Sequence, residues 1–133
     1  TKDLVKGGKV MNKLTKAEEE IMNVLWDIDK GFVKEIMEKL PEPKPAYNTV
    51  STIIRILCTK GFVNHEEFGR SHRYYPLINK DDYKSKYLKN VVNRFFDNSY
   101  KNLVSFFSES DDLSLAELED LKKIIEKQME KKQ

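Results

Sequence analysis

The 133-residue chain has a single cysteine, Cys58, which excludes an internal disulfide and any cysteine-rich zinc site. No run approaches the about 20 apolar residues of a membrane helix, and the N-terminus lacks the apolar core of a signal peptide. A glycine-rich phosphate loop and a nucleophile elbow are also missing from the sequence. These absences predict a cytoplasmic protein with no membrane insertion, no cofactor and no enzymatic activity.

Neither sign of charge is in large excess, because the net charge is only +2. Apolar residues make up 39% of the chain and charged residues 35%, which is typical of a globular protein with a heavily solvated surface. The length allows one ordinary domain, or two small units whose core a second copy of the chain could complete. The polar segment before Met11 predicts a flexible N-terminus, residues 1–13, that is in part not native. We interpret Cys58 as a small core residue.

Signals for three helices fill the first half of the chain. The segment Thr15-Lys16-Ala17-Glu18 is a capping box, which predicts that a helix begins there and ends near Asp29-Lys30-Gly31. Three prolines stop a second short helix, and Gly61 stops a third near Lys60. The predicted buried residues are Ala17, Ile21, Val24, Leu25 and Ile28 in the first helix, Val33, Ile36, Met37 and Leu40 in the second, and Val50, Ile53, Ile54 and Leu57 in the third.

The outer face of the third predicted helix collects Asn48, Ser51, Thr52 and Arg55 at about 100° per residue. These side chains can donate or accept the hydrogen bonds that base edges and phosphates require, although an ordinary solvated face would have a similar composition. Two β-rich runs follow, Phe62 to Phe68 and Ser71 to Ile78, joined by a Gly69-Arg70 turn. Three helices and a hairpin predict a winged helix, in which the third helix enters the major groove.

The placement of charge agrees with this interpretation. The segment from Lys44 to Lys80 contains six basic and two acidic residues, so its net charge is +4 and that of the rest of the chain is −2. Arg70, His72 and Arg73 at the hairpin tip are predicted to contact phosphates, with solubility as their alternative role. The predicted DNA-binding residues are Lys44, Tyr47, Asn48, Thr49, Ser51, Thr52, Arg55, Arg70, His72 and Arg73.

The remaining residues, 80–133, are predicted to form helices with a break at Asn98-Ser99 and a second capping box at Ser114 to Glu117. Their apolar side chains could form an internal core, but short helices following a complete winged-helix domain (residues 14–79) expose more apolar surface than they can bury alone. We therefore expect a dimerisation domain. Its predicted interface residues are Tyr87, Leu88, Val91, Phe95, Phe96, Leu103, Phe106, Phe107, Leu118, Leu121 and Ile125.

In this order, the elements resemble the penicillinase and methicillin-resistance repressors, the BlaI/MecI family. The stretches that carry the resemblance are Leu14 to Glu18 with Ile21-Met22 and Leu25-Trp26, Tyr47 to Leu57, Lys60 to Val63, Tyr74 to Pro76, Leu103 to Phe107, and Leu113-Ser114. The resemblance implies a homodimeric repressor on a palindromic operator, controlling resistance or sensor-peptidase genes. It also implies relief of repression by a sensor peptidase, with Phe106–Phe107 as the candidate cleavage site. The family's asparagine at this bond is replaced here by Phe106.

Two interpretations compete with these expectations. A winged-helix adaptor that binds another protein and never DNA is the main alternative function. His65 and His72 could suggest a zinc or copper site, but no acidic or thiol partner stands at metal-ligand spacing in the sequence, so no metal is predicted.

Overall fold

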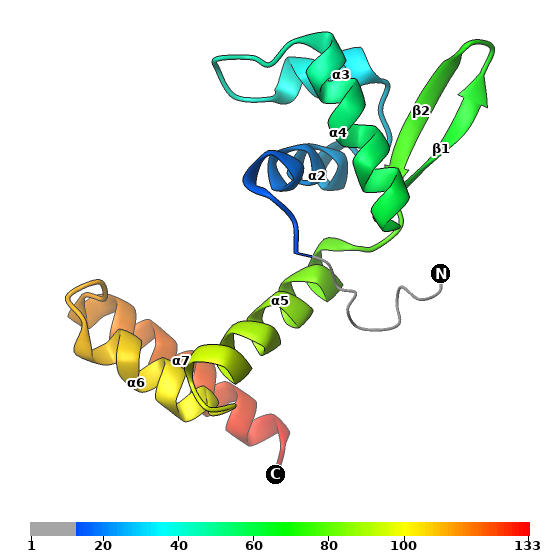
Figure 1. The fold of residues 1–133 in the computed structure, drawn as a ribbon. Helices are drawn as coiled ribbons and strands as arrows, with labels where there is room; N and C mark the ends of the chain where they lie inside the picture. The colour runs from blue at the N-terminus through cyan, green and yellow to red at the C-terminus, as the bar shows by residue number, and fades with distance from the viewer. Residues whose placement is uncertain (1–12) are drawn as a thin grey trace. The chain divides into compact units, whose positions relative to one another are not determined.

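Residues 13–133 are described by a computed structural model, drawn in Figure 1. The predicted flexible N-terminus lies outside the described residues except for Lys13. The chain divides into two compact units, with the division between Tyr83 and Lys84 inside one helix. The elements are α2 (Lys16–Ile28), α3 (Val33–Lys39), α4 (Tyr47–Lys60), β1 (Val63–Phe68), β2 (Ser71–Pro76), α5 (Lys80–Phe95), α6 (Tyr100–Glu109) and α7 (Leu115–Lys131).

The first unit is a three-helix body with a hairpin projecting from it, as Figure 1 shows. Its core consists of apolar side chains from α2, α3, α4 and the start of β1. The fully buried members are Ile21, Met22, Leu25, Ile36, Val50, Ile54, Leu57 and Val63. Since α4 contributes three of them at i, i+4 and i+7, one face of that helix is fixed against the body. The predicted mainly α fold with a β-hairpin wing is confirmed.

The buried face of α2 includes Met22, which was not predicted, and it also differs from the prediction at the start of the helix. Ala17 is exposed, whereas Glu18 lies on the buried stripe with Ile21, Met22 and Leu25. A charged residue can occupy this position because its carboxylate accepts hydrogen bonds from the Thr15 backbone N–H at 2.9 Å and from Lys60. The capping box itself is confirmed, with both reciprocal hydrogen bonds present.

β1 and β2 pair antiparallel, with Val63 opposite Pro76 and Phe68 opposite Ser71. Gly69 in the connecting turn has φ 60°, a left-handed conformation that favours glycine. A further bridge, not predicted from the sequence, pairs Gly31 with Tyr74. Each backbone N–H donates to the other residue's carbonyl oxygen, at 2.9 and 2.8 Å, so the connection between α2 and α3 is bonded to the base of the hairpin.

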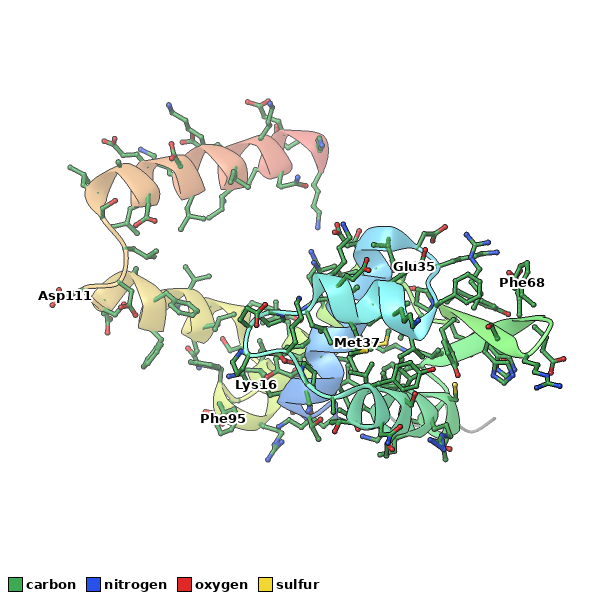
Figure 2. All side chains as sticks on the ribbon, turned by 90° about the horizontal axis from the view of Figure 1, so that it is seen from above. Lys16, Glu35, Met37, Phe68, Phe95 and Asp111 are labelled. Carbon is green, nitrogen blue, oxygen red and sulfur yellow. The ribbon has the colours of Figure 1, made fainter. Side chains whose placement is uncertain are left out.

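The second unit consists of the remainder of α5 together with α6 and α7. Its predicted break is present, since Asp97 and Asn98 have positive φ and the Ser99 side chain accepts from the Asn102 backbone N–H. Ser114 and Glu117 form the predicted second capping box. In the view of Figure 2, α7 stands apart from α6 beyond the connecting loop at Asp111. Within residues 13–133, no helix is both long and apolar enough to cross a membrane.

Candidate nucleic-acid interface

The outer face of α4 is exposed and mostly polar, with Ile56, 41% exposed, as an apolar residue on it. Asn48, Thr49, Thr52 and Arg55 are exposed, Ser51 is half-buried, and the Tyr47 side chain is 50% exposed. Helical periodicity places Asn48, Thr52 and Arg55 opposite Val50, Ile54 and Leu57, with Thr49 and Ser51 on the flanks, whereas Tyr47 lies next to the buried face at the start of α4. This face presents hydroxyl, amide and guanidinium groups to solvent, which are the groups that recognise base edges and phosphates.

An ion pair connects the C-terminal end of α4 to the start of α2. Lys60 Nζ lies 2.7 Å from Glu18 Oε1, and the two side chains are 24% and 6% exposed. Burial alone would raise the pKa of Glu18, but the hydrogen bonds from Lys60 and from the Thr15 backbone outweigh it and lower the pKa below the ordinary 4.5. The charged carboxylate thus helps to fix the orientation of α4 on the body.

Lys44 does not join the polar face of α4. Its ammonium donates to the backbone carbonyl oxygens of Met37, Glu38 and Leu40, at 3.2, 3.0 and 2.8 Å. These carbonyls belong to the C-terminal end of α3, where the helix leaves them without intrahelical partners and where a cation is favoured by the helix dipole. The structure gives Lys44 a helix-capping role, which its place among the prolines did not indicate.

The predicted phosphate-contacting residues of the wing lie at its tip and along β2. Arg70 is exposed in the turn, and His72 is exposed near the start of β2. Arg73 is half-buried, because its guanidinium lies over the Phe68 ring at 5.9 Å from the centroid. Phe68 in turn meets Phe32 edge-on at 5.8 Å. The arginines therefore occupy different environments, with Arg70 free of the packing that restrains Arg73.

Tyr74 connects the wing to α4. Burial is the main cause that raises its pKa, the neighbouring Cys58 and Tyr47 raise it further, and Arg55 acts in the opposite direction. These neighbours place the Tyr74 side of the hairpin toward α4, within electrostatic range of the Arg55 guanidinium. Cys58 is half-buried against the core as predicted, and burial raises the pKa of its thiol.

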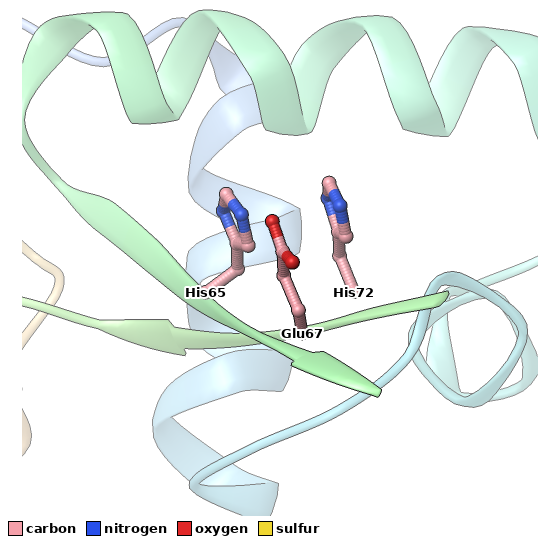
Figure 3. A group of neighbouring side chains, drawn as sticks. All are labelled: His65, Glu67 and His72. Carbon is pink, nitrogen blue, oxygen red and sulfur yellow. The ribbon is translucent and has the colours of Figure 1, made fainter. Parts of the chain in front are cut away.

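The two histidines do have an acidic neighbour, contrary to the expectation from the sequence. His65, Glu67 and His72 lie together on the hairpin, with their ligand atoms within 4.8 Å of one another (Figure 3). The spacing along the chain hid this group, because His72 belongs to the other strand and comes beside Glu67 only through the hairpin register. The register of an antiparallel pair was the signal that could have revealed it.

Contacts of two residues, Lys30 with the other side of the hairpin and Trp26 with the chain that follows it, also escaped prediction. Lys30 Nζ lies 3.0 Å from Glu66 Oε2 and 5.5 Å from the centroid of the Tyr75 ring. Trp26 Nε1 donates to the Ile78 carbonyl oxygen at 2.8 Å, which anchors the chain as it leaves the wing. Both contacts join segments distant in sequence and position the wing against the body.

The second unit exposes most of its apolar side chains. Val92 is fully buried, whereas α6 and α7 contain no buried residue within the described range 84–133. Phe95 is 70% exposed and Phe106 is 61% exposed, although Phe106 also meets Phe96 edge-on at 5.7 Å. Among the other predicted interface residues Tyr87, Leu88, Phe107, Leu121 and Ile125 are exposed, and Val91, Phe96, Leu103 and Leu118 are half-buried.

Three helices followed by a two-stranded wing, with a polar face on the third helix, define a winged helix-turn-helix protein. The model of the penicillinase repressor family matches residues 14–127. The chain therefore belongs to the penicillinase repressor family, and by family it is a DNA-binding transcriptional repressor and not an enzyme.

Individual relatives span nearly the whole chain. It is 32% identical to the methicillin resistance regulatory protein MecI of Staphylococcus aureus strain N315, over 86% of this chain and 94% of that protein. It is 30% identical to the penicillinase repressor of Bacillus licheniformis, over 93% and 98% respectively. The solved DNA-binding domain of the repressor BlaI is 30% identical, covers 53% of this chain and 88% of that one, and has a TM-score of 0.48.

Proposed function

We propose that this protein represses transcription as a homodimer bound to a palindromic operator, with α4 of each subunit in a major groove. The observation that carries the proposal is the exposed polar face of α4 on a helix whose opposite face is locked into the core. A twofold dimer presents two such helices to equivalent half-sites, about one helical turn or a multiple of it apart. The protein would act in the cytoplasm, where the operator DNA lies.

Within this interface, α4 reads bases and the wing contacts the backbone. Arg55 is the one charged side chain of the exposed α4 face, and an arginine can donate two hydrogen bonds to a guanine. Asn48, Thr49, Ser51 and Thr52 supply neutral donors and acceptors around it. Arg70 in the exposed turn and the half-buried Arg73 on β2 supply positive charge for phosphates.

The second unit would form the dimer. Helices α6 and α7 leave their apolar side chains in solvent, and a second copy offers an identical apolar surface that can cover them. The exposed aromatic and aliphatic residues from Tyr87 to Ile125 are of the type that dominates buried interface cores. The dimer would then hold two copies of the winged-helix unit on one operator.

Proteolytic relief of repression is proposed from the family resemblance, with a sensor peptidase acting near Phe106–Phe107. This bond lies in the last part of α6, which ends at Glu109. A peptidase must bind an extended segment, so the end of α6 would have to unwind before cleavage. Loss of α7 by such a cut would remove part of the proposed dimer surface. The controlled genes would be resistance or sensor-peptidase genes.

Gel-shift analysis with the protein's own promoter region tests this function. We expect a complex that dissociates at high salt, and we expect Arg55→Ala to weaken it by about 1–3 kcal/mol and to relax sequence discrimination. Asn23→Ala, at an exposed position of α2 outside this face, is the control, and circular dichroism checks that Arg55→Ala remains folded. A protein that binds no DNA but captures a protein partner would instead be an adaptor.

A further inference from the structure

One face of the wing gathers imidazole and carboxylate groups. Successive side chains of a strand alternate between its two faces, so His65 and Glu67 of β1 share a face with His72 and Tyr74 of β2. The register places Glu67 directly opposite His72, and His65 diagonally across from it. The two imidazole rings stack with their centroids 4.0 Å apart and an interplanar angle of 8°. Figure 3 shows the three side chains rising from the two strands on the same side.

The donor set suits a divalent transition-metal ion. The imidazole nitrogens and carboxylate oxygens of the three residues lie within 4.8 Å of one another. Ligands around a tetrahedral zinc ion are about 3.3 Å apart, given bonds of about 2.0–2.1 Å, so the required approach is at most about 1.5 Å, and the stacked imidazole rings must turn so that their nitrogens point toward one ion. His72 and Glu67 are exposed and His65 is half-buried, which leaves their side chains room to turn. Two imidazoles with one carboxylate select Zn²⁺ or its transition-metal neighbours over Mg²⁺ or Ca²⁺.

We propose that His65, Glu67 and His72 form a binding site for a zinc-class divalent cation on the wing, beside α4. The fourth coordination position is open to water. The contacts of the two imidazoles with Tyr74, at 5.7 and 6.0 Å between centroids, hold the rings at the side of the hairpin that faces α4. The remaining charged side chain on the tip, Arg70, lies beyond the site in the turn, and Glu66 and Arg73 belong to the opposite face.

Metal binding has two physical consequences. It cross-links β1 to β2 on both sides of the Gly69-Arg70 turn, which would stabilise the outer half of a hairpin whose base is already bonded to the body. It also replaces the negative charge of Glu67 by a net positive charge near Arg70. This second consequence rests on the proposed function, since added positive charge on the wing strengthens binding only if the wing meets DNA phosphates.

The site itself is tested without DNA, on the full chain freed of any polyhistidine tag. We expect calorimetric titration with Zn²⁺ to give one ion per chain, and Co²⁺ to show the visible absorption of tetrahedral nitrogen and oxygen ligation. Removing a residue that only supports a metal ligand typically weakens metal binding by roughly 10–100-fold. His72→Gln and Glu67→Gln each remove a ligand itself, so each should weaken Zn²⁺ binding by more than this. Circular dichroism verifies that these variants at exposed positions remain folded.

Glu66→Gln is the matched control, because Glu66 is next to Glu67 in sequence but faces Lys30 on the other side of the hairpin. It should bind Zn²⁺ with unchanged affinity. Equal binding by Glu67→Gln, His72→Gln and the control would overturn the site. An intense thiolate charge-transfer band with Co²⁺ would do the same, because it would assign the metal to Cys58.

A second measurement separates the metal site from DNA binding. Zn²⁺ should tighten binding to operator and to random DNA alike, and should steepen the slope of log affinity against log salt by about one unit per additional phosphate contact. His72→Gln should lose this response. Zn²⁺ binding without any change in DNA affinity would refute the coupling and leave the site intact, whereas failure of DNA binding in every condition would refute the proposed function.

Discussion

The two units of this chain differ in how far they bury their apolar side chains. In the first unit Ile54 is 0% exposed and is surrounded by core residues from α2, α3 and the hairpin, so one chain satisfies the packing. In the second unit Ile125 is 50% exposed on a helix without buried residues. The first unit completes its core within one chain, whereas the second would complete its burial only in the proposed dimer. In the proposed function, folding and association would therefore depend on different parts of one sequence.

The largest effect on operator binding should come from deleting the part of the second unit that is proposed to form the dimer. A chain ending at Phe106 lacks the end of α6 and all of α7, so it should remain folded in its first unit but become mainly monomeric. Operator affinity should fall by about 10²–10⁴-fold. The two α4 helices would no longer be tethered to each other, so binding of one to its half-site would no longer raise the effective concentration of the other at the second half-site. Sedimentation and gel-shift measurements check both expectations.

A chain ending at Glu130 is the control for this truncation, since it keeps nearly all of α7. It should behave as the full chain. If the Phe106 truncation were instead a stable dimer with full operator affinity, association would have to be assigned to the first unit.

A pair of identical substitutions sharpens the comparison. Ile54→Ala removes buried methyl groups and should lower the free energy of unfolding by about 2–5 kcal/mol at any protein concentration. Ile125→Ala should change the unfolding midpoint only in a way that depends on protein concentration, because its partner is expected on the second copy. Denaturant titrations at several concentrations distinguish the two, and concentration-independent destabilisation by Ile125→Ala would contradict the proposed division.

Within the first unit, the ion pair of Glu18 with Lys60 should matter next. Glu18→Gln removes a charge bonded to Lys60 and should destabilise the unit by about 2–3 kcal/mol at neutral pH. The folded-state pKa of Glu18 is lowered, so its contribution is present above the unfolded value of about 4.5 and is lost as pH falls through the folded value.

Chemical denaturation between neutral and acidic pH checks this expectation. The difference in stability between the parent and Glu18→Gln should shrink below about pH 4.5. Glu20→Gln, on the same helix but without an ion pair among the described residues, is the control. A difference that persisted undiminished to the lowest pH would assign the effect to packing instead of charge.

The smallest effect is expected from the wing. Replacing Arg70 and Arg73 by alanine should weaken specific and random DNA binding alike, and should make the salt slope shallower by about one unit per phosphate contact removed. Dimerisation, as a property of the second unit, should be unchanged in sedimentation. Selective loss of the specific complex would mean that the wing reads bases.

Local signals were enough to predict most of the fold. The capping boxes at Thr15 and Ser114 act over three residues, and each produced the expected reciprocal hydrogen bonds. The left-handed Gly61 ended α4 where the sequence indicated. The polar face of α4 could likewise be predicted, because helical periodicity alone determines which residues share a face.

The features that escaped prediction depend on contacts between distant segments. The bridge of Gly31 with Tyr74 requires the hairpin to fold back onto the connection between α2 and α3. The group of His65, Glu67 and His72 requires the strand register, and the position of Lys44 requires the path of the proline segment past the end of α3. None of these follows from spacing along a single element.

The bridge between Gly31 and Tyr74 fixes the base of the wing to the body. Hydrogen bonds and the contacts of Tyr74 clamp its base, whereas Phe68, Gly69 and Arg70 at its tip are exposed. A Cβ added at Gly31 would come within 2.6 Å of Ile28 Cδ1, so a larger residue at this position would require the end of the Ile28 side chain to move. The base of the hairpin and α4 therefore keep a common alignment, and the contact of Phe68 with Phe32 supports the hairpin near its tip, so that substitutions in the turn at Gly69 and Arg70 should leave this alignment intact.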